Sequence, residues 1–212
     1  MSPINELSDI TNRIINHEPF AFSRWGDGEW HNVDKRKGQN CDGNIYYEDL
    51  GDALLEVVST RRDYDLGVQT LHPWSVQQAK KFDQNWGDSD VMHKASEKNQ
   101  LQPLFDCLNN SYVIYIGNRS FSKLSFVDRL IEIPYNNVWL QKDILMDSIY
   151  STFDYKFKVY CFAAGMASNV FIHEAWNRNN TNVYLDVGSV FDPYVGRKTR
   201  GYHKTIPHLR DM

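Results

Sequence analysis

The sequence predicts an α/β fold in which a mainly parallel sheet is flanked by helices. Short runs of β-branched and aromatic residues alternate along the chain with longer segments whose apolar residues have helical spacing. This alternation is typical of parallel sheets, because each parallel connection needs a crossover that a helix usually supplies. The length of 212 residues fits one domain spanning residues 1–212.

The predicted strands are short apolar runs that end near a glycine, a proline or a charged residue. The clearest is Tyr-Val-Ile-Tyr-Ile-Gly at residues 112–117, five residues that favour strands closed by a glycine. In chain order, we expect strands at residues 20–23, 66–70, 112–117, 129–134, 158–164 and 182–188.

The predicted helices lie between these strands. Residues 45–60 show the pattern well, since Leu50, Leu54, Val57 and Val58 fall on one helical face. An amphipathic opening helix has Pro3 at or near its first turn and stops near Asn16. The polar, turn-rich residues 31–43 are expected to form a loop. The further helices are expected at residues 74–82, 101–108, 144–153 and 167–177.

Composition restricts the class of protein. The chain is 42% hydrophobic and 24% charged, which is typical of a globular protein, and its formal net charge of −4 provides no overall attraction to nucleic acid. Cys41, Cys107 and Cys161 are too far apart for a zinc motif, and the last two are expected to be buried thiols. No signal peptide or membrane-spanning run is evident, so we expect a soluble protein of the cytoplasm, or of the host cytoplasm if the source is viral.

The most informative segment, Arg24-Trp-Gly-Asp-Gly-Glu29, follows the first predicted strand. Asp27 and Glu29 flank one glycine, so the backbone can bend and direct both carboxylates to one point. Such a pair suits a hard divalent cation whose remaining ligands are phosphate oxygens. Arg24 would add a bidentate phosphate donor. The alternative is an acidic turn beside a surface arginine.

Two later strand ends have residues suited to a nucleotide. Gly165 opens a strand-to-helix turn of small residues, where a phosphate could approach free backbone amides, and Ser168 or Asn169 could add a side-chain donor. Close helix–sheet packing would favour the same small residues. Asp186, beside Gly188 at the end of the last strand, could bind a ribose or sugar hydroxyl. Because carboxyl ends of parallel strands meet at one edge, we expect these groups to lie close together.

The last segment, residues 191–212, is basic in an otherwise acidic chain. Three interpretations are open: a lid that closes over a diphosphate, a surface that follows a polyanionic acceptor, or a frayed basic tail. Four cations fall within nine residues of it, at positions 196–204: Arg197, Lys198, Arg200 and Lys204.

These motifs, in this order, resemble those of the GT-D-type glycosyltransferases, a Rossmann-like family with an early Asp-x-Glu metal motif. The likeness spans about residues 20–190 and rests on the Gly-Asp-Gly-Glu turn, the glycine-led turn at residues 164–170 and Leu185-Asp-Val-Gly188. Met166 and Ala167 stand where the family commonly has Pro and Thr.

The resemblance implies a single Rossmann-like, GT-D-like domain that transfers a sugar from a nucleotide-diphosphate sugar, most simply a UDP-sugar, to a glycan or glycoprotein hydroxyl. It implies that Asp27 and Glu29 hold Mn²⁺ or Mg²⁺ and that Asp186 holds a hydroxyl. The residues expected around the donor are Arg24, Gly26, Gly165, Ser168, Asn169, Gly188, Arg197, Lys198 and Arg200. An acceptor-activating base, needed if the reaction inverts, has three candidates: Asp186, Asp192 and His203.

Two other functions compete with this one. The same chemistry could act on hydroxymethylated bases of DNA, in which case the basic tail would contact the polyanion. The fold could also serve a Rossmann-like nucleotide-binding protein without transfer activity. A methyltransferase is disfavoured, because its acidic strand end lies early in the chain, whereas Asp186 lies near the end.

Overall fold

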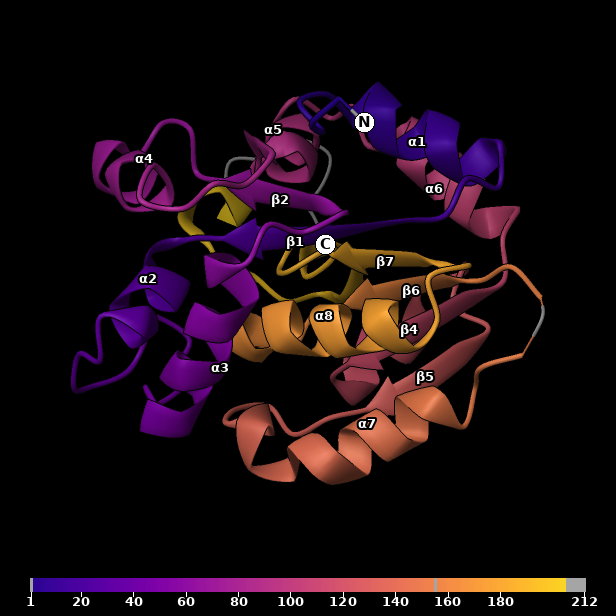
Figure 1. Ribbon diagram of the computed structural model, residues 1–212. Coiled ribbons are helices and arrows are strands. Elements are labelled where there is room, and N and C mark those ends of the chain that lie inside the picture. Colours follow the sequence, from indigo (N-terminus) through magenta and orange to yellow (C-terminus); the bar gives the residue numbers. More distant parts are fainter. Residues whose placement is uncertain (1, 155, 205–212) are drawn as a thin grey trace.

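The computed structural model describes residues 2–154 and 156–204 and confirms the predicted α/β fold. Within these residues seven parallel strands form one sheet in the order β3-β2-β1-β7-β6-β4-β5 (Figure 1). The strands are β1 (Phe20–Trp25), β2 (Asp65–Val68), β3 (Trp86–Asp88), β4 (Val113–Gly117), β5 (Arg129–Glu132), β6 (Val159–Phe162) and β7 (Val183–Asp186).

Helices cover both faces of the sheet (Figure 1). One face packs against α1 (Leu7–Ile15), α5 (Val91–Glu97) and α6 (Gln102–Asn109). The other packs against α3 (Glu48–Ser59), α7 (Lys142–Tyr150) and α8 (Ser168–Arg178), with α2 (Asp27–Val33) and α4 (Pro73–Ala79) at one end. Pro3 lies outside α1, whose first turn is capped instead by reciprocal bonds between Glu6 and Asp9.

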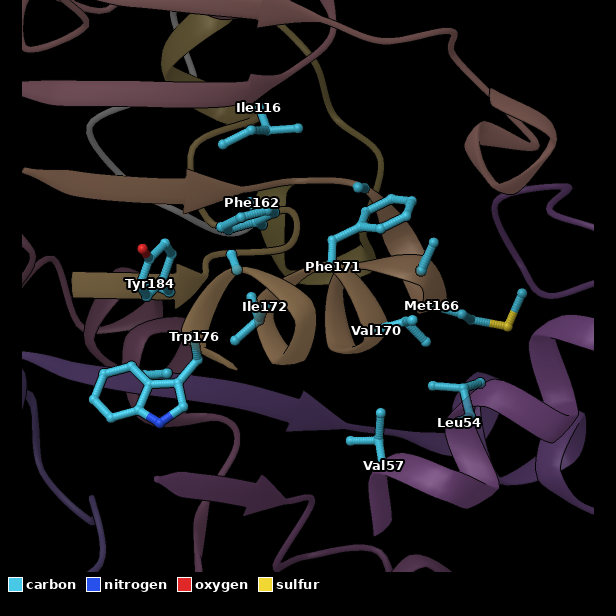
Figure 2. Close-up of a cluster of buried hydrophobic side chains, with 14 of the residues drawn as sticks. Leu54, Val57, Ile116, Phe162, Met166, Val170, Phe171, Ile172, Trp176 and Tyr184 are labelled. Atoms are coloured by element: carbon cyan, nitrogen blue, oxygen red, sulfur yellow. The ribbon is translucent and has the colours of Figure 1, made fainter. Parts of the chain in front are cut away.

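Helix α8 is central to the second face. Figure 2 shows Phe171 and Ile172 of α8 near Phe162 of β6, while Val170 approaches Leu54 and Val57 of α3. All these side chains are buried, and burying each aliphatic or aromatic group contributes roughly 1.5–3 kcal/mol. This packing fixes the turn before α8 against the sheet, and that turn contains Gly165.

The Asp27–Glu29 segment is helical rather than a turn, which corrects the expectation from the sequence. Gly26 is the N-cap of α2, and Glu29 at the third position accepts a hydrogen bond from the Gly26 amide at 2.8 Å. Acidic residues in a first turn are stabilised by the helix dipole, which explains why this sequence continues as helix through Val33. Asp27 and Glu29 are therefore fixed to a helix that follows β1 directly.

The sequence patterns missed β3 and α5. Strand β3 has three residues, too few for a periodic pattern, and it pairs with β2 at the edge of the sheet. The N-terminal segment lies alongside it, since the Asp88 amide donates to the Ile4 carbonyl at 2.9 Å. The buried thiols predicted at Cys107 and Cys161 are confirmed.

The first part of the basic segment is folded onto the domain. Phe191 and Val195 are buried in the core beside α6. The segment forms short 3-10 turns at Pro193–Val195 and Gly201–Lys204. Residues 205–212 of the predicted tail lie outside the described residues. No helix in the described ranges is both long and apolar enough to cross a membrane.

Candidate active site

A cleft of about 390 Å³ opens at the carboxyl ends of the strands, where ligands bind in parallel α/β sheets. It gathers residues from after β1, β6 and β7, as expected, and also from after β2 and β3. The residues predicted from the sequence that line it are Arg24, Gly26, Asp27, Glu29, Gly165, Asp186, Gly188 and Arg200.

Arg24 lies in the cleft wall and is held at two points. Its Nε donates to the Ser89 carbonyl at 2.7 Å, and its Nη2 lies 3.7 Å from an Asp90 carboxylate oxygen. Both partners belong to the loop between β3 and α5. The guanidinium is thus fixed in direction, as recognition of a phosphate by two parallel N–H groups requires.

Glu29 on α2, directly after β1, lies near Asp186 at the end of β7. The two are far apart in the chain, but β1 and β7 are neighbours in the sheet. The pKa of Glu29 is raised to about 7, chiefly by burial and to a smaller extent by Asp186, against the opposing effects of backbone amides and Arg24. Burial likewise raises the pKa of Asp186 to about 6, against the opposing effect of Arg24. Asp27 is exposed and accepts a hydrogen bond from the Gly28 amide at 3.0 Å. The site therefore has two carboxyls inside the cleft and a third at its rim.

Gly188 leaves the space that Arg24 occupies. Its φ of +49° is in the left-handed region, and a Cβ there would lie 2.3 Å from the Arg24 Nη1 atom. Its amide donates to an Asp186 carboxylate oxygen at 3.1 Å. The glycine is thus required both by its backbone conformation and by the arginine against it.

Replacing Gly188 with alanine is expected to lower the free energy of unfolding by about 1–2 kcal/mol and to displace Arg24, so that nucleotide affinity falls about tenfold. Urea denaturation and nucleotide titration would measure the two effects. Gly196→Ala is the matched control, since Gly196 has φ +81° but no atom within 4 Å of the added Cβ. Equal affinity losses in both variants would contradict the role given to Gly188.

The side chains of Ser168 and Asn169 are turned into the protein. Both are fully buried. Ser168 Oγ accepts a hydrogen bond from the Ala164 amide at 3.1 Å, and Asn169 bonds with the Ser23 hydroxyl and donates to the Arg24 carbonyl at 3.0 Å. Neither side chain lines the cleft. Asn169 therefore ties α8 to the end of β1 and fixes the backbone at Arg24.

A smaller compartment of about 100 Å³ adjoins the cleft. Asp42 and Arg200 line both cavities and form a bidentate ion pair, with Nη2 2.6 Å from Oδ2. This pair joins the loop after α2 to the basic C-terminal segment. The residues common to both cavities are Asp42, Gly165, Gly188, Ser189 and Arg200.

The other predicted residues of the basic segment lie in or beyond this smaller compartment. Asp192 and Arg197 line it and pair at 3.5 Å, and burial raises the pKa of Asp192. Lys198 is exposed and lines neither cavity. His203 also lines neither cavity, and its Nδ1 accepts a hydrogen bond from the Arg200 amide at 3.2 Å. Burial, with Arg200 nearby, lowers the pKa of His203 to about 4.

The sequence reasoning missed the cleft residues from the loops after β2 and β3. Asp90, His93 and Lys94 line the cleft, and burial holds the pKa of His93 well below its usual value. Gln69 follows β2 and lies beside Gly26. The Asp-Ser-Asp run at residues 88–90 was the one available signal, because acids after a strand mark a strand end.

Structural comparison identifies the fold. One similar solved structure is described as a new glycosyltransferase (DUF1792) from Streptococcus sanguinis; the TM-score is 0.68 at 14% identity, over 92% of this chain and 84% of that one. This chain has the same fold. A second structure, described as a highly conserved domain of unknown function 1792 with a distinct glycosyltransferase fold, matches with a TM-score of 0.66 at 13% identity, over 91% and 80% of the two chains. No family model and no curated protein matches the sequence. The GT-D resemblance is thus confirmed at the level of the fold.

Proposed function

We propose that this protein is a metal-dependent glycosyltransferase that moves a sugar from a nucleotide-diphosphate sugar to a hydroxyl acceptor. The observation that carries the proposal is the gathering of Arg24, Asp27, Glu29 and Asp186 in one cleft at the strand ends. The fold that holds this cleft is shared with structures described as glycosyltransferases. A UDP-sugar is the donor we expect, and a glycan or glycoprotein the acceptor. The cytoplasmic location expected from the sequence stays a prediction.

The charge of the cleft supports a requirement for a cation. A diphosphate is an anion, and a lining with an excess of carboxylates would repel it. The lining contains six acidic side chains, Asp27, Glu29, Asp42, Asp90, Glu97 and Asp186, against three basic ones, Arg24, Lys94 and Arg200.

The oxygen donors of Asp27 and Glu29 suit Mn²⁺ or Mg²⁺, and the metal would neutralise charge on the departing diphosphate. Among residues 2–154 and 156–204, no three His, Cys, Asp or Glu side chains are arranged to hold a metal. The protein therefore offers an incomplete set of ligands, and phosphate oxygens of the donor would complete it. We expect Mn²⁺ to bind weakly alone and more tightly with UDP present.

In the transfer, the acceptor oxygen forms a bond to the anomeric carbon while the bond from that carbon to the diphosphate oxygen breaks. Arg24 would hold the phosphates, and backbone amides near Gly165 would add donors. The acceptor's proton needs a base. Asp186 and Asp192 line the two cavities, and burial raises the pKa of each, which favours accepting a proton near neutral pH. His203 lines neither cavity, so we propose one of the two aspartates.

Metal binding in the presence of UDP is expected to strengthen as the pH rises. Because the pKa of Glu29 is about 7, this carboxyl is protonated at low pH and must lose its proton when a cation binds. Isothermal titration of Mn²⁺ into the UDP-saturated protein at about pH 5.5 and about pH 8 should show at least about tenfold tighter binding at the higher pH. Equal affinities at both pH values would exclude the Glu29 carboxylate as a ligand.

A thermal-shift panel tests the proposed function. Nucleoside diphosphates and nucleotide sugars would be tested singly, each with and without Mn²⁺. We expect one nucleotide sugar to raise the melting temperature, with metal required and the effect lost in Asp27→Ala. Stabilisation by a nucleotide that needs no metal, without slow hydrolysis of any donor, would favour the non-catalytic nucleotide-binding protein instead.

A further inference from the structure

We propose that the smaller compartment is the acceptor subsite and that it accepts an uncharged sugar ring stacked on Tyr135. The proposal rests on the glycosyltransferase function above and identifies where its second substrate binds. The compartment touches the main cleft at Asp42, Gly165, Gly188, Ser189 and Arg200. A hydroxyl placed there would face the donor across this shared boundary.

The two cavities can be assigned because they differ in charge. The main cleft holds the excess of carboxylates and the fixed guanidinium of Arg24, which suit a metal and a diphosphate. The smaller compartment is lined by two arginines and two aspartates, and each arginine is paired with an aspartate. Its net charge is therefore zero, so it offers little attraction to a polyanion.

These ion pairs bear on the role of the basic segment, which the sequence left open between a lid, a surface for a polyanion and a frayed tail. Arg197 pairs with Asp192, and Arg200 pairs with Asp42, so both guanidiniums are already neutralised. Lys198 is exposed and lines neither cavity. Within the described residues 191–204, the two arginines therefore build a wall of the compartment rather than a track for DNA phosphates. This observation favours a neutral carbohydrate over hydroxymethylated DNA as acceptor.

Tyr135 provides the surface on which a sugar would stack. It lines the compartment, and 63% of its surface is exposed, so its ring is accessible to a ligand. The Arg197 guanidinium lies 5.0 Å from the Tyr135 ring centroid and 5.5 Å from that of Phe121. Arg197 thus supports the tyrosine ring from one side and leaves the rest of it open to solvent.

The polar groups of the compartment fit the hydroxyls of a sugar. Ser189 and Asn44 line it together with the carboxylates of Asp42 and Asp192. Asp192 is itself oriented by the Thr199 hydroxyl and by Arg197. A pyranose has an apolar face that can stack on an aromatic ring and hydroxyls that need hydrogen-bonding partners. The ring of Tyr135 and these polar side chains supply both.

Saturation-transfer NMR tests the proposal with methyl β-glycosides of glucose, galactose and N-acetylglucosamine as probes. Each probe is added to the protein with UDP and Mn²⁺. We expect at least one glycoside to receive saturation from the native protein, with affinity reduced about tenfold in Tyr135→Ala and nearly native in Tyr135→Phe. Tyr112→Ala is the matched control, because Tyr112 is also exposed, at 49%, but precedes β4 and so lies at the amino ends of the strands, away from the cavities.

Binding of UDP, measured for every variant by titration, distinguishes failure of the acceptor subsite from failure of the proposed glycosyltransferase function. If the native protein binds UDP with Mn²⁺ but no glycoside binds, or if Tyr135→Ala binds glycosides as the native protein does, the acceptor subsite is wrong and the donor site stands. The acceptor subsite would also be overturned if a short single-stranded DNA received saturation from the native protein and less from Arg197→Ala. If the native protein binds no nucleotide, the glycosyltransferase function fails first.

Discussion

Replacing Asp27 with alanine should reduce metal-dependent sugar transfer by at least about a hundredfold. The carboxylate lies exposed at the cleft rim on the first turn of α2, and no other described residue donates a bond to it except the adjacent Gly28 amide. Its removal therefore takes away a proposed metal ligand without breaking a network that supports the fold. Release of nucleoside diphosphate from the donor, followed over time, measures the loss.

Glu29→Gln should produce a similar loss of transfer with a different effect on stability. Desolvation raises the pKa of Glu29 to about 7, so at higher pH its charge destabilises the metal-free fold, and the uncharged amide removes that cost. Asp147→Ala is the control, because Asp147 is exposed on α7 and does not line the cleft. Native transfer rates in both Asp27→Ala and Glu29→Gln would exclude the metal assignment.

Replacing Arg24 with alanine should weaken binding of the nucleotide diphosphate by about a hundredfold. Charge-assisted hydrogen bonds contribute roughly 1.5–3 kcal/mol each, and the guanidinium can offer two to a phosphate. The same change removes the positive charge that lowers the pKa of Glu29 and of Asp186, so both carboxyls should hold their protons to higher pH. Titration of UDP at several pH values measures both effects.

Arg24→Lys distinguishes the fixed direction of the guanidinium from its charge. Lysine keeps the charge but cannot reproduce the Nε bond to the Ser89 carbonyl together with two donors directed into the cleft. We expect intermediate affinity for UDP. An affinity equal to that of the native protein would show that charge alone acts at this position.

The location of the site could be predicted from the sequence, because a parallel sheet brings the carboxyl ends of its strands to one edge. This rule predicts that Asp27, Gly165 and Asp186 lie near one another, and the cleft contains all three. It could not give the orientation of Ser168 and Asn169. Their side chains point inward because α8 packs closely on β1 and β7, and helical phase relative to a sheet depends on that packing.

Two parts of the site were beyond sequence reasoning for different physical reasons. The three residues of β3 are too few for a periodic signal, so Asp90, His93 and Lys94 had no predicted element to position them. The pairing of Arg200 with Asp42 joins loops far apart in the chain, and such contacts follow from tertiary placement alone. The basic segment therefore looked like free positive charge, whereas the fold neutralises two of its arginines.

Turnover of the donor tests most directly whether the cleft binds and activates a nucleotide sugar. The native protein would be incubated with a panel of UDP-, GDP- and CMP-linked sugars and methyl β-glycosides, with Mn²⁺ or with a chelator, and release of the nucleotide would be followed. We predict release from one donor, dependent on metal and accelerated by a glycoside. Release of no nucleotide under any of these conditions would contradict the assignment of a glycosyltransferase.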